Sequence, residues 1–411
     1  MTERLYYHDS FLYEFDAEVL NLSASNPDSR PTVILDRSAF YPTSGGQVFD
    51  LGWILPGGST EVSDRLRVAE VIEREDGQIL HILENAGSIQ KGSCIHGLID
   101  ADRRRDHMQQ HSGQHVLSAA FVRLFNLPTV SFHMGAEACS IDLDTKSLTT
   151  AQIEAAEALA NDVVMQNRAV RIRFVTQEEA RGLGLRKIPP VERDQLRLID
   201  VHDFDLTACG GTHVAATGEI GCILLRKTEK TRQGWRVEFV CGKRAIATAR
   251  RDYAVLAESG GLLSSHIWDI SQQIRKLHEE SRASRKSREQ LLEELADLYA
   301  SRLLTETPES GGRKIIVRIF PDRDLAFIKL LVQRLTRQSA AVVAFFAITS
   351  VQPALIFAQS AGQPFDMGAL MKEMLARQGG RGGGSKDLAQ GGPTQIEGLE
   401  AALAELASRL G

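Results

Sequence analysis

Two short motifs about 90 residues apart place the strongest restriction on how this chain folds. In the first, DHMQQHSGQH, His107, His111 and His115 recur every fourth residue, and residues four apart lie on one face of a helix. The second is Cys209-Gly-Gly-Thr-His213, in which the glycines permit a tight turn. Two imidazoles from the first motif and the thiolate and imidazole of the second complete the N₃S tetrahedral set that Zn²⁺ prefers. The sequence therefore predicts a fold that joins the two motifs at one zinc ion.

The residues alone leave open which two histidines of the first motif bind the metal. The pair His107 and His111 and the pair His111 and His115 have the same spacing. A single His-x-x-x-His pair on a helix is also typical of a partly buried polar face that binds no metal. The Cys209–His213 motif is what favours the zinc interpretation.

Length and composition describe an ordinary soluble protein of several domains. With 411 residues, 43% of them hydrophobic and 25% charged, we expect two or three domains. The sequence contains no apolar run of about 18 residues, so we expect no membrane-spanning helix. The N-terminus, MTERLYYHDSFLYEF, carries charges where a signal peptide needs an apolar stretch, so we expect a cytoplasmic protein. Five scattered cysteines without a CxxC pair argue against a disulfide framework.

The charge does not by itself indicate a nucleic-acid partner. The net charge is −5, whereas RNA-binding domains are often basic. Local basic clusters do occur at Arg103–Arg105, Arg226–Arg251 and Arg282–Arg288. Each is interpreted either as a solvated surface or as an RNA contact.

The sequence of the N-terminal half of the chain predicts strands and one helix. Apolar runs such as PTVILD, RVAEVI and GQILHIL, separated by turn residues, predict a β-rich region over residues 1–100. Apolar spacing predicts a helix over residues 102–125 with Asp102 as its cap. The segments GCILLRKTEK and WRVEFVCG are typical of a β-hairpin.

The C-terminal half is expected to begin with a long helix and to end in a small α/β domain. Apolar residues at spacings of three and four predict a helix from Leu262 to Leu304. Its polar middle fits an extended helix, an imperfect coiled coil or a surface helix packed on its own domain. After a break at 305–312, KIIVRIF, AVVAFFAI and PALIFAQS predict buried strands.

We therefore expect an α+β protein of four parts. These are a β-rich N-terminal subdomain (1–100), a zinc-containing α/β domain (101–258), a long helical linker (259–306) and a small C-terminal α/β domain (307–411).

Both metal motifs resemble those of a known family. HSGQH followed by CGGTH is similar to the zinc motifs of the editing domain of alanyl-tRNA synthetases, and DHMQQHSGQHVLSAAF looks still more like the freestanding AlaX editing proteins. YPTSGGQ, VSFHMG and ATGEIG also fit, in the family's order, over residues 1 to about 250. The resemblance implies that the zinc ligands are His111, His115, Cys209 and His213, with His107 as an alternative ligand or a supporting residue.

The resemblance also implies an activity. It is the ATP-independent, zinc-dependent hydrolysis of the ester of tRNA(Ala) wrongly charged with serine, or with glycine. Gln47 would position the reacting groups and Thr43 would recognise the serine hydroxyl. Four protein ligands are usual for a structural zinc site, so the sequence leaves open whether the ion is catalytic or structural.

A glycine-rich segment near the C-terminus carries a second resemblance. Residues 379–390 are not a P-loop, because Ser385 follows Gly384 where a lysine is required. They are either a flexible linker or a loop whose backbone N–H groups bind phosphate, at residues Arg381, Gly382, Gly383, Gly384 and Lys386.

This segment resembles the C-terminal domain of alanyl-tRNA synthetases, which also occurs in DHH-family phosphoesterases. The resemblance implies tRNA binding and a homodimer formed through helix 262–304 or the C-terminal domain. The metal motifs of the phosphoesterases are missing. Because no synthetase core precedes residue 1, we expect action in trans on tRNA charged elsewhere.

Two other functions stay open. The closed ligand set also fits a non-catalytic, zinc-stabilised tRNA-binding protein or regulator. A zinc hydrolase for another ester or amide is a third hypothesis, but it does not explain the glycine-rich C-terminal domain.

Overall fold

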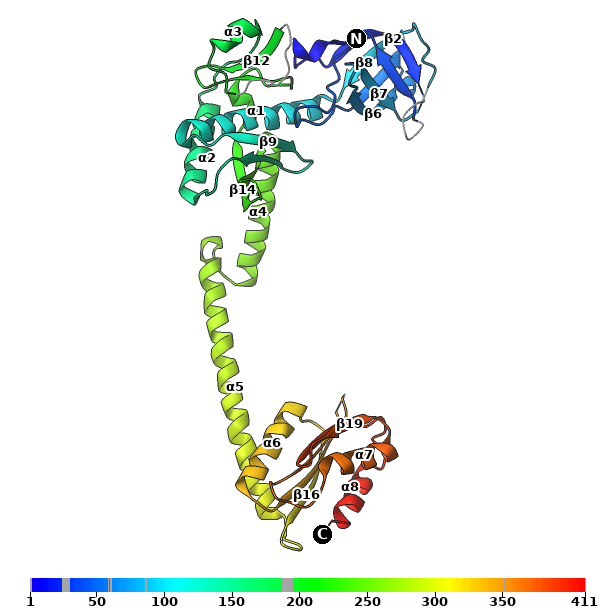
Figure 1. Cartoon of the computed structure of the whole chain (residues 1–411), viewed down its shortest axis with the longest axis vertical. Coiled ribbons are helices and arrows are strands. Elements are labelled where there is room, and N and C mark those ends of the chain that lie inside the picture. Colours follow the sequence, from blue (N-terminus) through cyan, green and yellow to red (C-terminus); the bar gives the residue numbers. More distant parts are fainter. Residues whose placement is uncertain are drawn as a thin grey trace. The chain divides into compact units, whose positions relative to one another are not determined.

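The chain folds as two compact units, residues Met1–Glu258 and Ser259–Gly411 (Figure 1). The computed structural model describes residues 2–23, 30–57, 59, 61–85, 87–186, 195–350 and 352–410. Each unit has hydrophobic cores of its own. No helix among these described residues is long and apolar enough to cross a membrane.

A closed six-stranded β-barrel forms the start of the first unit. Its strands follow the order β2-β3-β7-β6-β5-β8, and their bounds are β2 (Glu14–Ser23), β3 (Thr32–Leu35), β5 (Gly52–Pro56), β6 (Leu66–Glu73), β7 (Ile79–Leu83) and β8 (Cys94–Ile99). The strands expected in PTVILD, RVAEVI and GQILHIL are present as β3, β6 and β7. Beside the barrel lie β1 (Glu3–Arg4), β4 (Arg37–Ser38) and the short helices η1 (Leu5–Tyr7) and η2 (Val62–Asp64).

The central helix of the unit is α1 (Ala101–Phe125). The predicted helix is confirmed, but the predicted cap, Asp102, is wrong. Asp102 already lies in the first helical turn, so the preceding Asp100, whose backbone is extended, accepts the N–H of Arg103 instead.

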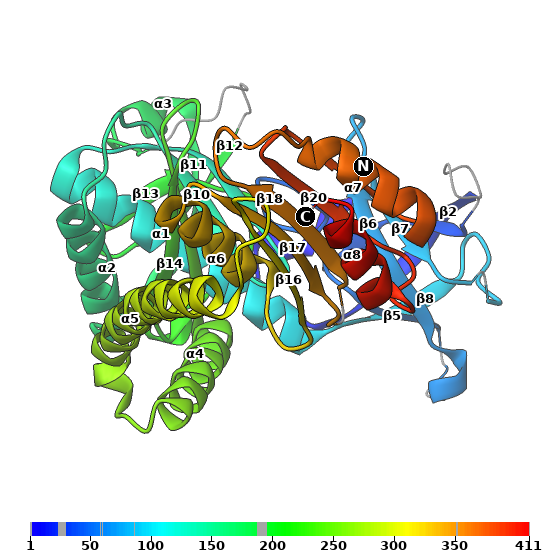
Figure 2. The same cartoon turned by 90° about the horizontal axis from the view of Figure 1, so that it is seen from below.

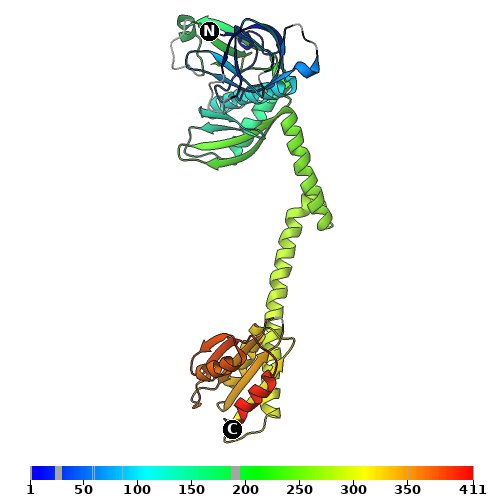
Figure 3. The same cartoon turned by 90° about the vertical axis from the view of Figure 1, so that its right-hand side faces the viewer.

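Helix α1 lies between two sheets, as Figures 1 and 3 show. On one side is a three-stranded sheet, β11-β12-β13, and on the other a four-stranded sheet, β14-β15-β10-β9. The predicted hairpin is confirmed as β14 and β15. The bounds are β9 (Thr129–Met134), β10 (Cys139–Leu143), α2 (Thr150–Met165), β11 (Val170–Thr176), α3 (Gln177–Arg181), β12 (Gln195–Val201), β13 (Asp205–Ala208), η3 (Thr217–Ile220), β14 (Ile223–Lys230) and β15 (Trp235–Cys241).

The predicted long helix starts later than expected. Residues up to Leu262 belong to α4 (Gly242–Leu262), and a turn with Ser264 at φ 48° separates it from η4 (Ile267–Asp269) and α5 (Ile270–Glu306). Glycine and serine are poor helix formers, and the run GGLLSS breaks the helix that the apolar spacing suggested. The apolar spacing predicted a helical face correctly, but it did not indicate this interruption.

The second unit contains a five-stranded sheet covered on both faces. The strand order is β16-β17-β18-β20-β19, and Figure 2 shows α6 on one face with α7 and α8 on the other. The bounds are β16 (Lys314–Phe320), α6 (Leu325–Gln338), β17 (Val342–Ile348), β18 (Ala354–Gln359), α7 (Met367–Gln378), β19 (Arg381–Gly384), β20 (Leu388–Gly392) and α8 (Leu399–Ser408). The three strands predicted from apolar runs are β16, β17 and β18.

The glycine-rich segment is neither a linker nor an open loop. Arg381–Gly384 forms the edge strand β19, which pairs antiparallel with β20 through a short turn. The segment is ordered because β20 in turn pairs with the buried strand β18. The N–H groups expected to bind phosphate therefore belong to a sheet edge.

One buried histidine of the barrel gives the fold a predicted pH dependence. His81 in β7 lies against Ser38 Oγ (2.7 Å from Nε2) and Val33 O (3.1 Å from Nδ1). Burial lowers its pKa to about 4, below the roughly 6.5 of an unfolded chain. The unfolded state therefore binds a proton first as the pH falls, and stability decreases from pH 6.5 to 4.

At pH 5, His81 should cost about 2 kcal/mol relative to pH 7. We expect His81→Asn to be less stable than the wild type at pH 7 and to lose less unfolding free energy on going to pH 5. Urea unfolding of both proteins at the two pH values measures this. Equal pH dependence of the two proteins would contradict the assignment.

Candidate metal centre

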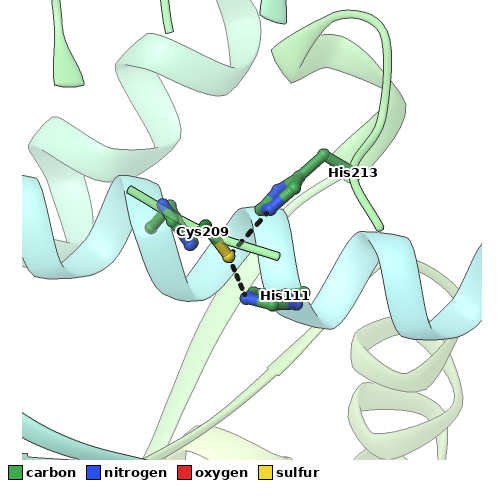
Figure 4. A group of neighbouring side chains, drawn as sticks. His111, Cys209 and His213 are labelled. Atoms are coloured by element: carbon green, nitrogen blue, oxygen red, sulfur yellow. Dashed lines mark hydrogen bonds between the residues drawn. The ribbon is translucent and has the colours of Figure 1, made fainter. Parts of the chain in front are cut away.

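Four side chains from two segments converge next to the middle of α1. His111 and His115 come from α1, and Cys209 and His213 from the turn after β13. Their ligand atoms all lie within 4.8 Å of one another. Figure 4 shows the Cys209 sulfur facing both His111 and His213; it lies 3.3 Å from Nε2 of His111 and 3.4 Å from Nε2 of His213.

This geometry fits a tetrahedral zinc ion. With Zn–N near 2.0–2.1 Å and Zn–S near 2.3 Å, a thiolate and an imidazole nitrogen on one ion are about 3.5 Å apart. The two S···N distances agree with that value. The structure thus brings together the four residues that the family resemblance implied, and His107 is outside the group.

Each histidine of the cluster has its Nδ1 atom next to a second polar side chain. His111 Nδ1 lies 2.6 Å from Gln47 Oε1, His213 Nδ1 lies 3.1 Å from Ser112 Oγ, and His115 Nδ1 lies 3.5 Å from Asp205 Oδ2. At His111 the amide oxygen favours the hydrogen on Nδ1 and leaves Nε2 as the metal-binding atom. The Ser112 hydroxyl can donate or accept, and the Asp205 carboxylate is beyond hydrogen-bond distance of His115.

Gln47 is placed for this role and is fully buried. The Thr212 N–H donates to its Oε1 (3.1 Å), while its Nε2 donates to Thr212 Oγ1 (2.8 Å). Because the backbone N–H needs an acceptor, the amide oxygen is the atom that also faces His111. Gln47 therefore orients a ligand of the centre through hydrogen bonds on both ends of its amide.

The electrostatics of the cluster favour a thiolate at Cys209. Burial alone would raise the pKa of Cys209, but the facing His111, His115 and His213 hold it well below its ordinary value. Burial lowers the pKa of His213 to about 3. A deprotonated thiol and unprotonated imidazoles are the forms that bind metal.

The turn of the second motif requires a glycine at position 211 for a steric reason. A Cβ at Gly211 would lie 2.1 Å from Cε1 of His111, so only glycine lets this turn pass beside the imidazole. The Gly211 N–H also approaches the Cys209 sulfur at 3.4 Å. The spacing of Cys209 and His213 therefore depends on a residue without a side chain.

The other sequence candidates lie in different surroundings. Thr43 is exposed, and its hydroxyl oxygen accepts the Phe49 N–H at 3.2 Å. His107 is buried, and burial together with Arg103 and Arg244 lowers its pKa to about 3. Thr43 has no hydrogen bond to the four-residue cluster among the described residues, and its role stays a prediction.

The predicted tRNA-binding residues belong to the second unit. Arg381 and Lys386 are exposed, at β19 and in the turn that joins it to β20. Gly382, Gly383 and Gly384 form the rest of β19.

Sequence reasoning missed several residues that support the centre. The His213 N–H donates to Ser10 Oγ (3.1 Å), and Arg197 donates to the carbonyl oxygens of Cys209 (2.6 Å) and Tyr7 (2.8 Å). Arg197 and Asp205 are the first and ninth residues of RLIDVHDFDL, the segment that leads to the cysteine motif. For Tyr7 and Ser10, about 200 residues away, the sequence offers no signal.

A cavity of about 750 Å³ lies next to this centre without including it. It is lined by Asp205, by its ion-pair partner Arg186 and by residues at the C-terminal end of α1. None of the four clustered residues lines it, so the cavity is not the place where a substrate would meet the metal.

Three family models match the chain. They describe tRNA synthetases class II (A) over residues 3–103, the threonyl and alanyl tRNA synthetase second additional domain over residues 196–238, and the DHHA1 domain over residues 312–411. The second match includes the cysteine motif, and the third covers the five-stranded domain.

Curated relatives extend over nearly the whole chain. The alanyl-tRNA editing protein AlaX-L of Pyrococcus horikoshii is 31% identical over 95% of this chain and 94% of its own length. The alanine–tRNA ligases of Archaeoglobus fulgidus and Pyrococcus furiosus are 31% and 30% identical over 96% and 100% of this chain. The chain spans only 42% and 44% of the length of those two ligases.

One solved structure also matches part of the chain. The C-Ala domain from Aquifex aeolicus alanyl-tRNA synthetase is 20% identical and covers 25% of this chain and 96% of its own, with a TM-score of 0.24. At that score the likeness carries no argument.

Proposed function

The chain belongs to the alanyl-tRNA editing proteins of the AlaX-L type, and from that premise we propose that it hydrolyses the aminoacyl ester of tRNA(Ala) mischarged with serine or glycine. The observation that carries this proposal is the His111–His115–Cys209–His213 cluster with its oriented imidazoles. The product would be free tRNA(Ala) and the free amino acid.

The proposed cofactor is Zn²⁺, held by the four clustered residues. When bound, it would polarise the ester carbonyl or lower the pKa of a water molecule. Gln47 and Ser112 would orient two of the three imidazoles. Cys209 is half-buried and Gly210 exposed, whereas the three histidines are buried, so the substrate ester would approach from the side of the cysteine.

Selectivity requires a polar contact, because alanine is smaller than serine and size alone cannot protect correctly charged Ala-tRNA(Ala). A site that hydrogen-bonds a substrate hydroxyl rejects an analogue without it by roughly 10⁴-fold or more. We assign this contact to Thr43. Its oxygen accepts a backbone N–H, so its own hydrogen is free to donate outward.

Thr43→Val should slow Ser-tRNA(Ala) hydrolysis by roughly ten- to hundredfold, in line with about 1–3 kcal/mol for an unmade buried hydrogen bond. Zinc content should not change. Gly-tRNA(Ala) is the internal control, since it lacks the hydroxyl and its hydrolysis should change less. Wild-type rates on Ser-tRNA(Ala) would remove Thr43 from this role.

The second unit is proposed to bind tRNA at the β19–β20 edge. Arg381 and Lys386 supply positive charge, and the N–H groups of the edge strand that face away from β20, at Gly382 and Gly384, supply donors for phosphate oxygens. Phosphate contacts of this kind fix position without reading sequence.

Replacing both Arg381 and Lys386 by glutamine should weaken tRNA binding and reduce the slope of log affinity against log salt by about 1–2. The matched control is Lys329→Gln with Arg337→Gln on α6, which removes the same charge from two other exposed residues of this unit. Filter binding at several salt concentrations measures both. Equal losses in the two double variants would contradict a local phosphate site.

We also propose a homodimer through α5. Leu277, Leu291 and Leu298 are exposed and spaced by seven or fourteen residues, so they form one stripe along the helix. A second copy of the chain would cover this stripe. A solution mass of a single chain at micromolar concentration would contradict the dimer.

A non-catalytic tRNA-binding function is the second candidate, since four protein ligands resemble a structural zinc site. It predicts tRNA binding with no ester hydrolysis.

A further inference from the structure

Residues 2–10 form part of the wall of the metal centre. Strand β1 pairs with β4, and η1 follows directly. From there the segment contacts the Cys209–His213 turn: the Ser10 hydroxyl accepts the His213 N–H, and the Tyr7 carbonyl shares the guanidinium of Arg197 with the Cys209 carbonyl. The cysteine turn is therefore fixed against the N-terminal segment.

Three tyrosines meet at this wall, and they differ in exposure. The Tyr6 ring packs edge-on against Tyr7 and Tyr41, with centroids 5.1 and 5.2 Å apart. Tyr6 and Tyr41 are buried, and the Tyr41 hydroxyl donates to Ser44 O at 3.0 Å. Tyr7 alone of the three is half-buried and faces solvent in part.

The Tyr7 hydroxyl has an unused hydrogen. Its oxygen accepts the Arg4 Nη1–H at 2.7 Å, and among the described residues no acceptor is recorded for its own hydrogen. The guanidinium carbons of Arg4 and Arg197 lie 5.3 and 5.5 Å from the centre of the Tyr7 ring. These contacts hold the ring in place, and the adjacent cations make the phenol a stronger hydrogen-bond donor.

The hydroxyl lies on the exposed side of the cluster. A Cβ at Gly210 would be 3.3 Å from the Tyr7 oxygen and 3.6 Å from Cε1 of its ring. Gly210 is exposed and directly follows Cys209, the least buried of the four clustered residues. The phenol is thus next to the face from which an ester would reach the cluster.

We propose that the Tyr7 hydroxyl donates a hydrogen bond to the carbonyl oxygen of the aminoacyl ester on the terminal ribose of the substrate. The bond strengthens as negative charge develops on that oxygen during attack by water, and no proton is transferred. This assignment rests on the proposed deacylase function and adds a catalytic residue to it. Arg4 and Arg197 are positioning residues, because they act on the substrate only through Tyr7.

Tyr7→Phe tests the donor, since it keeps the ring and its stacking contacts with both arginines and removes only the hydroxyl, with its bond from Arg4. We expect kcat for Ser-tRNA(Ala) hydrolysis to fall by about tenfold or more with little change in KM, because the interaction is made mainly in the transition state. Zinc content and thermal stability should equal those of the wild type. Tyr253→Phe, at an exposed tyrosine of α4, is the matched control.

Two further variants separate the donor from other roles of Tyr7. If the hydroxyl only anchors Arg4, Arg4→Met should reproduce the whole loss of Tyr7→Phe; we expect a smaller loss. If the ring only stacks on the substrate, Tyr7→Phe should retain wild-type kcat and Tyr7→Leu should not. Either result would overturn the donor assignment. A wild-type protein without hydrolysis would instead refute the proposed function itself.

Discussion

Cys209→Ala is expected to lose most of its zinc and nearly all of its deacylase activity. The thiolate is the only anionic member of the cluster, and its sulfur lies 3.3 and 3.4 Å from two of the imidazole nitrogens. Removing a partner that merely orients a ligand already costs 10–100-fold in metal affinity, so loss of the thiolate should cost more than about 100-fold. Three neutral imidazoles would remain around a divalent cation.

Elemental analysis of purified variants measures this directly. Cys222→Ala is the matched control, because Cys222 is half-buried like Cys209 but lies outside the cluster. His107→Ala should also retain zinc, since His107 is not in the group. One equivalent of zinc in Cys209→Ala would refute the proposed ligand set.

Arg104→Met is expected to destabilise the first unit by about 3–5 kcal/mol, the usual cost of leaving one member of a buried ion pair alone. Arg104 and Asp50 are both fully buried and form an ion pair. Arg104 also donates to Ser10 O at 2.9 Å, and Asp50 accepts the Tyr41 N–H at 2.7 Å. The Arg104 guanidinium therefore holds α1 against the segments that contain Gln47 and Ser10.

The neighbouring Arg105 provides the control. Arg105 is exposed, so Arg105→Met should change the free energy of unfolding by no more than about 0.5 kcal/mol. Urea unfolding at pH 7 compares the two variants. A similar stability of Arg104→Met and Arg105→Met would show that the ion pair does not hold the fold together.

The same arginines show where sequence reasoning reaches its limit. A run of three arginines suggested a solvated or RNA-binding surface, yet its middle member is buried against Asp50, and Arg103 donates to the Phe49 carbonyl. Burial of a charge depends on a partner 54 residues away, which no local pattern reveals. The pH dependence of His81 has the same origin, since its partners Ser38 and Val33 lie on other strands.

Local sequence patterns predicted the helices and strands whose formation depends on neighbouring residues. Apolar spacing identified α1, the β14–β15 hairpin and three strands of the second unit. Motif spacing left two histidine pairs open, and the family resemblance implied the four residues that the structure brings together. The N-cap of α1 is Asp100, two residues before the predicted Asp102, and the turn near Ser264 interrupts the predicted long helix. Both errors concern element ends, where one or two residues decide the outcome.

The supporting residues around the centre depended on tertiary structure. Gln47 was predicted through the family resemblance, and the structure adds its bonds to His111 and Thr212. Tyr7 and Ser10 had no sequence signal, because only the packing of the N-terminal segment on the cysteine turn gives them a role. The ligand roles themselves stay predictions until metal is measured.

The most direct test is hydrolysis of labelled Ser-tRNA(Ala), with Ala-tRNA(Ala) alongside, by the full chain before and after zinc removal. We expect rapid release of serine, little release of alanine, loss of activity in the chelated protein and recovery when Zn²⁺ is restored. A zinc-loaded, folded protein that binds tRNA but releases serine no faster than buffer does would contradict the deacylase function and favour a non-catalytic tRNA-binding protein.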